Sequence, residues 1–406
     1  MTTRAQKHFD IVIIGGLGRV GLPLGLAFAQ KGLSVCLYDL DRKNASLVKR
    51  GIMPFIEHGA KGVLRKVLQN GTLHISLDKT VISHGKYVII TIATPIDEYL
   101  NPKTRLYLES IKKISQHFST DQTIIIRSTV FPRMCEQVRR ILGPSSKWKI
   151  AYCPERTVQG YTMNELAILP QIVAGLTPEA TKNAVYLFSK LSPKIIIASV
   201  REAELIKLFA NAWRYILFAV TNQFYIISQS VGVDYEPLRK KMIDSYGRAA
   251  NVPTAGFTAG PCLLKDTMQL FAFNNNQFFL GHAAMMVNEG LPNFLVEKLK
   301  TTHDLTRTKV GILGMSFKAD SDDIRDSLSY KLLKILTFQG AQVYCSDELV
   351  KNDNFLTKRA LVKKCQVVIV AVPHAAYRGL QIPEHIDVID LWGITTKLTT
   401  HGKKGN

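Results

Sequence analysis

The segment Phe9–Gly32, FDIVIIGGLGRVGLPLGLAFAQKG, decides the fold of this chain. It begins with an apolar run typical of a buried strand and continues into Gly16-Leu17-Gly18-Arg19-Val20-Gly21, the first residues of a predicted helix that ends at Gly32. Glycines at such a junction allow a tight turn and let backbone N–H groups approach a pyrophosphate at the helix N-terminus. The alternative is a glycine turn that binds no dinucleotide.

The next strand, in LSVCLYDLD, ends near Asp39, which lies 18 residues after Gly21. A carboxylate at this place would accept a hydrogen bond from an adenosine ribose hydroxyl and would favour NAD over NADP. Arg42 weakens that preference slightly. The order of strand, glycine turn, helix and second strand therefore predicts an NAD site.

Alternating strands and helices continue to about residue 200. The apolar runs are KYVIITIATP, QTIIIRSTV, KIAYCPER, QIVAG and KIIIASV. Near-continuous Val and Ile strands that alternate with helices indicate a parallel, doubly wound sheet.

Residues 201–231 contain no Gly or Pro and predict one helix of about 45 Å, long enough to connect two domains. Helical sequence continues to about residue 300, where KVGILGMSFK begins a second α/β region. The predicted fold is α/β, with two doubly wound Rossmann-like domains joined by a long central helix. We expect an NAD-binding domain over 1–200, the helix with a dimerisation region and a catalytic loop over 201–300, and a C-terminal α/β domain over 301–406.

Composition limits the classes of ligand. The 406-residue chain carries a formal net charge of +20, but its basic residues are dispersed, which favours phosphate-bearing small molecules over nucleic acid. No run of 18 apolar residues predicts a membrane span, and the N-terminus lacks a signal region. The six cysteines are scattered without a CxxC pair, so we expect reduced thiols, a cytoplasmic protein and no metal site.

Polar residues follow several predicted strands at the sheet edge that lines the ligand crevice in such folds. Thr94, Ser128-Thr129 and Glu155 hold these places. The threonines are either turn formers or ligand contacts. Glu155 is a capping residue, an acid/base group or a group that positions water.

A polar stripe crosses the long helix at Glu204, Lys207, Asn211 and Arg214, whose spacings of three, four and three put them on one face. Most other positions are apolar, so this stripe needs partners. One account is an internal salt bridge from Glu204 to Lys207. The other is a cleft lined by Lys207 and Asn211.

The segment GFTAGPCLLKD, residues 256–266, places Cys262 in a Gly/Pro-rich loop. A structural cysteine is one interpretation. A nucleophilic thiolate is the other, with Lys265 supplying a nearby cation and Asp266 a general base. Further on, Lys318 and Arg325 lie among aspartates in SFKADSDDIRDS. They either pair with those acids or hold the phosphates of a ligand.

Seven of these stretches together resemble the UDP-glucose/GDP-mannose dehydrogenase family, over essentially the whole chain. The stretches are GGLGRVGLP, ATP, RSTV, PER, AELIKLFANAW, GFTAGPCLLKD and GMSFKADSDDIRDS. The resemblance implies two NAD per turnover, oxidation of the C6 alcohol of a nucleotide sugar to a carboxylate, a cysteine thioester, a C-terminal UDP-binding domain and a homodimer formed through the long helix.

The resemblance also implies residue roles. Cys262 would be the nucleophile, Lys207 and Asn211 would stabilise the oxyanion, and Asp266 would transfer protons with Thr129 and Glu155 ordering a water. The implied cofactor contacts are Gly16, Gly18, Arg19, Val20, Gly21, Asp39, Thr94, Thr129, Lys265 and Arg325. The implied substrate contacts are Glu155, Arg156, Lys207, Asn211, Arg248, Phe257, Gly260, Lys318 and Arg325, with Arg248 acting across the dimer interface.

Two features bear on the substrate. Pro154-Glu155-Arg156 is similar to members that oxidise UDP-N-acetylhexosamines, whereas members acting on UDP-glucose or GDP-mannose more often carry Asn-Pro-Glu-Phe. Ala259-Gly260-Pro261 stands where many members carry Gly-Gly-Ser or Gly-Gly-His before the cysteine. We expect a UDP-N-acetylhexosamine 6-dehydrogenase for surface polysaccharide precursors, with UDP-glucose as the alternative sugar. A non-catalytic NAD or nucleotide-sugar binder and a two-electron hydroxyacid dehydrogenase are the competing classes.

Overall fold

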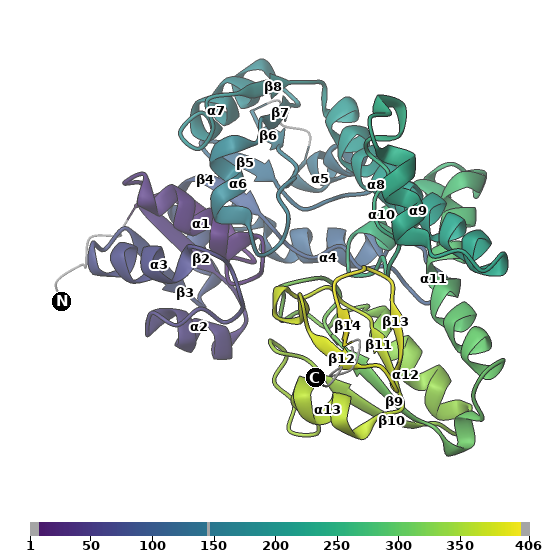
Figure 1. Ribbon diagram of the computed structural model, residues 1–406. Coiled ribbons are helices and arrows are strands. Elements are labelled where there is room, and N and C mark those ends of the chain that lie inside the picture. The colour runs from purple at the N-terminus through teal and green to yellow at the C-terminus, as the bar shows by residue number, and fades with distance from the viewer. Residues whose placement is uncertain (1–7, 144–146, 399–406) are drawn as a thin grey trace, which may run out of the picture. The chain divides into compact units, whose positions relative to one another are not determined.

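The computed structural model describes residues 8–143 and 147–398, which form two compact units that meet between Ala210 and Asn211 (Figure 1). The helix α8 (Val200–Ser230) runs from the first unit into the second. It agrees with the predicted uninterrupted helix and is about 45 Å long. No helix in the described ranges is long and apolar enough to cross a membrane. The three-part division of the chain stays a prediction.

In the described part of the first unit, eight strands form one sheet in the order β3-β2-β1-β4-β5-β6-β7-β8. The strands are β1 (Phe9–Ile14), β2 (Val35–Tyr38), β3 (Leu73–Ser76), β4 (Gly85–Ile90), β5 (Thr123–Ile126), β6 (Lys149–Tyr152), β7 (Gln171–Gly175) and β8 (Ile195–Ile197). All neighbours run parallel except β6 and β7, which are antiparallel.

The antiparallel pair differs from the expected all-parallel sheet for a geometric reason. The helix between β6 and β7 is α6 (Thr162–Ile168), which is about 10 Å long and does not carry the chain back across the sheet. Strand β7 therefore starts beside the carboxyl end of β6 and runs the opposite way. The longer α7 (Pro178–Phe188) then returns the chain, so β8 is parallel to β7.

Helices cover both faces of this sheet, which makes it doubly wound as predicted (Figure 1). Alternate residues of β1 point to opposite faces: Ile11 and Ile13 pack in one core, Val12 and Ile14 in the other. The first core contains residues of α1 (Gly21–Gln30), α2 (Arg42–Lys49), α3 (Ala60–Gln69), α6 and α7. The second contains residues of η1 (Lys79–His84), α4 (Thr104–Ser115), α5 (Met134–Leu142) and the start of α8.

The second unit contains a parallel sheet in the order β10-β9-β11-β13 and a small pair, β12 with β14. The strands are β9 (Lys309–Leu313), β10 (Gln342–Ser346), β11 (Val367–Val370), β12 (Gln381–Pro383), β13 (Asp387–Asp390) and β14 (Thr396–Leu398). The helices after α8 are α9 (Tyr235–Ile243), η2 (Gly247–Ala249), α10 (Leu263–Phe273), α11 (Phe279–Lys300), η3 (Leu305–Arg307), α12 (Leu328–Phe338), α13 (Lys358–Lys364) and η4 (Ala375–Tyr377). One face packs on α11 and α12 and the other on α13, so this part is also doubly wound.

The two sheets start with the same turn geometry. Gly15 after β1 and Gly314 after β9 both have positive φ, +76° and +94°. Asp39 follows β2, Asp347 follows β10, and each carboxylate accepts backbone N–H groups of its turn. The two turns differ in sequence: Gly16 and Gly18 follow Gly15 in the first, whereas Ser316 and Phe317 follow Gly314 in the second.

Candidate active site

The glycine turn after β1 has the shape that a pyrophosphate requires. A Cβ at Gly21 would lie 2.4 Å from the carbonyl oxygen of Gly15, and a Cβ at Gly16 would lie 2.8 Å from both the carbonyl oxygen of Ile13 and the Cβ of Leu37, so both positions need glycine for packing. A Cβ at Gly18 would meet only the Gly15 carbonyl at 3.4 Å, so glycine there leaves the backbone open to a ligand. The turn therefore fits the phosphates of NAD at the start of α1.

Asp39 lies beside this turn, as the sequence predicts. Its Oδ2 accepts a hydrogen bond from the backbone N–H of Leu17 at 2.9 Å, and its Oδ1 accepts from Leu40 at 2.7 Å. The carboxylate is half-buried at the carboxyl end of β2. Arg19 has its guanidinium over the ring of Phe55, at 4.9 Å.

Thr94 and Thr129 come together at the carboxyl ends of β4 and β5. The hydroxyl of Thr94 donates to the carbonyl oxygen of Thr129 at 2.6 Å. Sequence reasoning missed Thr91, whose hydroxyl donates to the carbonyls of Ile14 and Gly15 at 2.8 and 3.0 Å and braces the glycine turn. Its place directly after a buried strand was the only local signal.

Glu155 is buried in an ion pair that sequence reasoning also missed. Its Oε2 accepts from the Arg127 guanidinium, with Nη2 at 2.9 Å and Nε at 3.2 Å, and its Oε1 accepts from the N–H groups of Arg156 and Thr157. Burial would raise the pKa of Glu155, but Arg127 and the Thr157 N–H outweigh it and lower the pKa. The geometry favours the capping role among the three alternatives. The side chain of Arg156 is exposed.

The residues of the polar stripe on α8 differ in burial and in hydrogen-bond partners. Glu204 is buried and accepts from the N–H groups of Arg133 and Cys135 at 2.7 and 3.1 Å, so it caps the start of α5. These two backbone donors hold its carboxylate. Burial raises the pKa of Glu204 despite these bonds. Lys207 is half-buried and Arg214 is exposed.

Asn211 and Asp266 meet in the second unit, as expected for one site. The amide of Asn211 donates to Asp266 Oδ2 at 2.5 Å, and both side chains are buried. The Lys265 ammonium pairs with Asp266 Oδ1 at 2.7 Å. The Asp266 carboxylate is therefore held by an amide on one oxygen and a cation on the other.

Cys262 is exposed, whereas the other five cysteines of the chain are buried. It is the residue that precedes α10, so its thiol stands at the positive end of that helix. Asp266 follows one turn later on the same helix. The pKa of Arg325 is raised, chiefly by its hydrogen bond to Asp323 and in smaller part by the charge of Cys262, so a guanidinium lies near this thiol.

The glycines of the Cys262 loop are required by aromatic rings beneath them. Gly260 has φ +99°, and a Cβ there would lie 2.3 Å from the ring of Phe317. A Cβ at Gly256 would lie 2.1 Å from the ring of Trp392. The backbone N–H of Gly260 also donates to the carbonyl of Asp326 at 3.2 Å. The loop is thus seated on segments of the C-terminal sheet.

Two buried amides fix the root of this loop, and sequence reasoning missed both. Asn222 of α8 donates to the carbonyl of Gly256 at 3.0 Å and accepts from its N–H at 2.9 Å. Asn222 also donates to Asn288 of α11 at 2.9 Å, and Asn288 donates to the carbonyl of Tyr215 at 3.1 Å. Phe257 is buried in the adjoining apolar core.

The two cations of the segment 316–327 differ in their surroundings. Arg325 forms a bidentate pair with Asp323, with Nη2 to Oδ2 at 2.7 Å and Nε to Oδ1 at 3.0 Å, so the pairing alternative holds for it. The ammonium of Lys318 lies 6.0 Å from the ring centre of Phe317. Arg248, in η2, is exposed.

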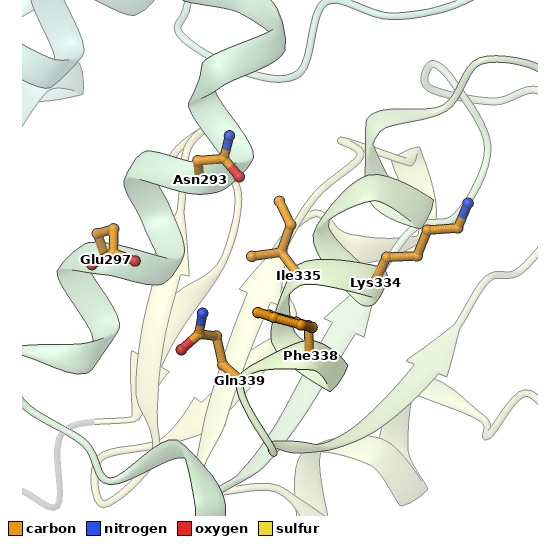
Figure 2. A pocket seen from close by; sticks show the side chains of 6 residues that line it. All are labelled: Asn293, Glu297, Lys334, Ile335, Phe338 and Gln339. Carbon is orange, nitrogen blue, oxygen red and sulfur yellow. The ribbon is translucent and has the colours of Figure 1, made fainter.

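Two surface hollows have no predicted site residue among the residues that line them. One, of about 510 Å³, lies between α11 and α12 and is lined by Asn293, Glu297, Lys334, Ile335, Phe338 and Gln339 (Figure 2). The other, of about 450 Å³, is lined by Ile196, Ile197, Ala198, Glu202, Leu205, Ile206 and Phe209. In residues 8–143 and 147–398, no cluster of three or more His, Cys, Asp or Glu side chains is placed to hold a metal ion.

Comparison with known families covers most of the chain. The UDP-glucose/GDP-mannose dehydrogenase family matches by its NAD binding domain over residues 9–191, its central domain over 201–289 and its UDP binding domain over 311–397. The glycine turn after β1 falls in the first match and Cys262 in the second. Segment 316–327 falls in the third.

Curated relatives match at low identity over nearly full length. A UDP-N-acetyl-D-mannosamine dehydrogenase of Pyrococcus horikoshii is 25% identical and covers 91% of this chain and 90% of its own. One of Campylobacter jejuni is 26% identical, with 93% and 98% covered. A UDP-glucose 6-dehydrogenase of Rickettsia bellii is 25% identical, with 91% of each chain covered.

Solved structures share the fold. The UDP-N-acetyl-mannosamine dehydrogenase of Staphylococcus aureus superposes with a TM-score of 0.85 at 23% identity, covering 96% of each chain. A UDP-glucose dehydrogenase of Pyrobaculum islandicum gives 0.85 at 22% identity, with 97% and 96% covered. With the three domain matches, the chain belongs to the UDP-glucose/GDP-mannose dehydrogenase family, and it is an NAD-dependent oxidoreductase with a UDP-binding C-terminal domain.

Proposed function

We propose that this protein oxidises the C6 alcohol of a UDP-sugar to a carboxylate through a thioester on Cys262. The observation that carries the proposal is the exposed Cys262 thiol at the start of α10, one turn before the buried Asp266–Asn211 pair. An accessible thiol at a helix N-terminus and near Arg325 is placed to react as a thiolate. The other five cysteines are buried and lack this access.

The chain's own groups account for the covalent steps. NAD, when bound, accepts one hydride in each of two oxidations, so a sugar yields two NADH. The Cys262 thiolate adds to the C6 aldehyde and forms a thiohemiacetal, whose oxidation leaves a thioester. Water then displaces the thiol and releases the carboxylate. Lys207 and Asn211, one turn apart on α8, supply the ammonium and amide that stabilise the oxygen charge.

We assign proton transfer to a carboxylate and the ordering of the attacking water to a hydroxyl and a second carboxylate. We assign Asp266 to the proton released when the thiol and the water react, because its carboxylate is buried in the first turn of α10, the helix that Cys262 precedes. Thr129 would order the water. Glu155 would support it from the buried pair with Arg127, since protein donors already contact both of its oxygens. These roles rest on the family resemblance and on the contacts named.

We assign the cofactor contacts to the turn Gly16–Gly21 with Arg19 and Val20, to Asp39 for the ribose, and to Thr94 and Thr129 at the strand ends. Lys265 is assigned to the cofactor, and Arg325 to both the cofactor and the substrate, from their places near Cys262. The remaining substrate contacts that we propose are Arg156, Phe257, Gly260 and Lys318. Phe257 would act through the loop, because its side chain is buried.

We propose a UDP-N-acetylhexosamine as the sugar, with UDP-glucose as the alternative. Pro154-Glu155-Arg156 supports this choice, and so do the relatives named UDP-N-acetyl-D-mannosamine dehydrogenase. A product of this class would serve surface polysaccharide synthesis. A nucleophilic thiol also requires reducing conditions, which supports action in the cytoplasm.

We further propose a homodimer formed through α8. Large exposed apolar side chains follow one another along this helix and continue to Val231, directly after its end: Phe209, Trp213, Val220, Phe224, Ile227 and Val231. Intervals of three, four and seven residues place them on one stripe. A continuous apolar stripe of this length indicates a protein interface. Arg248 would then reach the partner's substrate.

A panel of UDP- and GDP-sugars assayed for NADH at 340 nm tests the proposal. We expect two NADH per sugar, an inactive Cys262→Ala variant and a stalled or greatly slowed Cys262→Ser variant. Cys153→Ser, which changes a buried cysteine, is the matched control. Full turnover by Cys262→Ala would remove the nucleophile assignment. One NADH per sugar would indicate a two-electron dehydrogenase, and binding without NADH formation a non-catalytic binding protein.

A further inference from the structure

His374 is a fully buried side chain, four residues after β11, whose two ring nitrogens have different partners. Nδ1 accepts a hydrogen bond from the backbone N–H of Asp320 at 3.0 Å, and Nε2 lies 3.1 Å from Asp347 Oδ2. A backbone N–H only donates, so Nδ1 carries no proton. The ring hydrogen is therefore on Nε2, where it donates to Asp347.

Asp347 gives His374 a fixed anchor. Its Oδ2 also accepts from the N–H groups of Met315 and Ser316 at 2.6 and 3.0 Å, and its Oδ1 accepts from Leu349 and Val350. Burial would raise the pKa of Asp347, but the hydrogen bonds from His374 and the backbone lower it to about 2. This aspartate binds the turn after β9 and the Nε2 edge of the imidazole, and no part of its side chain is exposed.

The opposite edge of the imidazole, at Nδ1, binds the middle of the segment 316–327. Asp320 has φ +52°, and its carboxylate accepts from the N–H of Ala375 at 2.9 Å. Two hydrogen bonds thus tie Asp320 to His374 and its neighbour. Lys318 and Arg325, the two proposed substrate cations, lie on either side of this attachment.

The same segment supports the Cys262 loop. Its Asp326 carbonyl accepts from the N–H of Gly260, and its Phe317 ring fills the space beside Gly260. Phe317 is held in turn by a backbone bond to the carbonyl of Asp323 at 2.8 Å. A shift of the segment would therefore move both the substrate cations and the support of the nucleophile loop.

We propose that His374 is a positioning residue that locks the segment 316–327, and that it thereby aligns the nucleotide-sugar contacts with the Cys262 loop. This inference rests on the proposed function for Lys318, Arg325 and Cys262. The lock itself is a feature of the free protein and does not depend on which sugar is oxidised.

Two variants distinguish the hydrogen bond at Nδ1 of His374 from the hydrogen bond at its Nε2. In His374→Asn the amide oxygen stands near the place of Nδ1 and keeps an acceptor for the Asp320 N–H. In His374→Gln the amide nitrogen stands near the place of Nε2 and keeps the donor to Asp347 but loses that acceptor. His385→Gln, at an exposed histidine of the same sheet domain, is the matched control.

Hydrogen exchange of the ligand-free protein, resolved at the Asp320 amide, measures the lock directly. We expect His374→Gln to speed this exchange at least tenfold, and His374→Asn and His385→Gln to leave it within about threefold of wild type. In steady-state assays His374→Gln raises KM for the UDP-sugar about tenfold and leaves KM for NAD within about twofold, while His374→Asn keeps both KM values near wild type.

Unchanged exchange at Asp320 in His374→Gln would overturn the proposal. So would equal increases of both KM values in both variants, because that result indicates a general loss of stability. If the wild-type protein turned over no UDP-sugar, the proposed function would fail, and the exchange experiment would still decide whether His374 locks the segment.

Discussion

At the scale of single residues, the contacts of Glu155 decide between the roles open to it. A general base needs an oxygen that can take a proton, but the Glu155 oxygens accept from Arg127, Arg156 and Thr157. Its partner Arg127 is buried and also donates to Cys153 and Gln171. A buried ion pair with further hydrogen bonds holds the carboxyl ends of β5 and β6 and the first residue of β7 in place.

Replacing Glu155 by Gln removes the charge and leaves Arg127 buried without its anion. Breaking one side of a buried pair costs about 3–5 kcal/mol of unfolding free energy, so the melting temperature at pH 7 falls clearly. The pKa of Glu155 is lowered from its ordinary 4.5. Its contribution is therefore complete above about pH 4.5 and is lost as the pH falls through the folded-state value.

Thermal unfolding between pH 7 and pH 3 measures this effect. The wild-type protein should lose stability below pH 4.5 more steeply than Glu155→Gln does. Glu109→Gln, which breaks the exposed pair with Arg105, is the control and should change little. A Glu155→Gln variant with wild-type stability but no turnover would instead support a direct role in catalysis.

At the scale of elements, the start of α10 and the loop before it act together. The loop requires glycine at Gly260, since φ is +99° and Phe317 occupies the place of a Cβ. Asn222 and Asn288 hold the other end of the loop at Gly256. The thiol thus projects from backbone that is fixed at both ends, which suits a nucleophile that must meet a substrate carbon.

Gly260→Ala should lower kcat at least tenfold, because the Cβ strains the backbone and displaces Phe317. NAD affinity should change little, because the glycine turn after β1 belongs to the other unit and the proposed cofactor contacts Lys265 and Arg325 are kept. Gly290→Ala in α11 is the matched control: no atom lies within 4 Å of its added Cβ, and helix propensity favours alanine by about 0.5–1 kcal/mol. Wild-type kcat in Gly260→Ala would contradict this account of the loop.

Across the whole molecule, α8 stands out because several of its large apolar side chains are exposed. Trp213, near the middle of the helix, is 64% exposed, and Ile227, in its last turn, is 53% exposed. Exposing apolar side chains of this size to water is unfavourable in free energy, and a contact with another protein surface removes that exposure. The stripe therefore favours association of two copies along α8.

Trp213→Glu combined with Phe224→Glu should convert the proposed dimer to a monomer, since each change places a charge in the apolar stripe. Light scattering after size exclusion at micromolar concentration measures the mass. Phe338→Glu is the control, because Phe338 is 87% exposed on α12 beside the hollow of Figure 2. Dissociation by the control alone would move the interface from α8 to that surface.

Much of the fold follows from local patterns. The run from Phe9 to Gly21 predicts strand, turn and helix because apolar period and glycine placement act over a few residues. The absence of Gly and Pro over 201–231 predicts α8 for the same reason. The loop at Cys262 and the carboxylate Asp39 were found by motif and spacing.

The remaining features depend on contacts between residues far apart in the chain. Arg127 meets Glu155 across 28 positions, Asn222 meets Asn288 across 66, and His374 meets Asp320 across 54. A period of two or 3.6 residues carries no information about such partners. Local patterns in the sequence predict the two sheets, the long helix and the glycine-rich loop that carries Cys262, because backbone preference and burial act over a few neighbouring residues. The tertiary structure alone shows which polar groups pair with each other in the interior and which hold the loops, because these hydrogen bonds and ion pairs form when distant segments pack together.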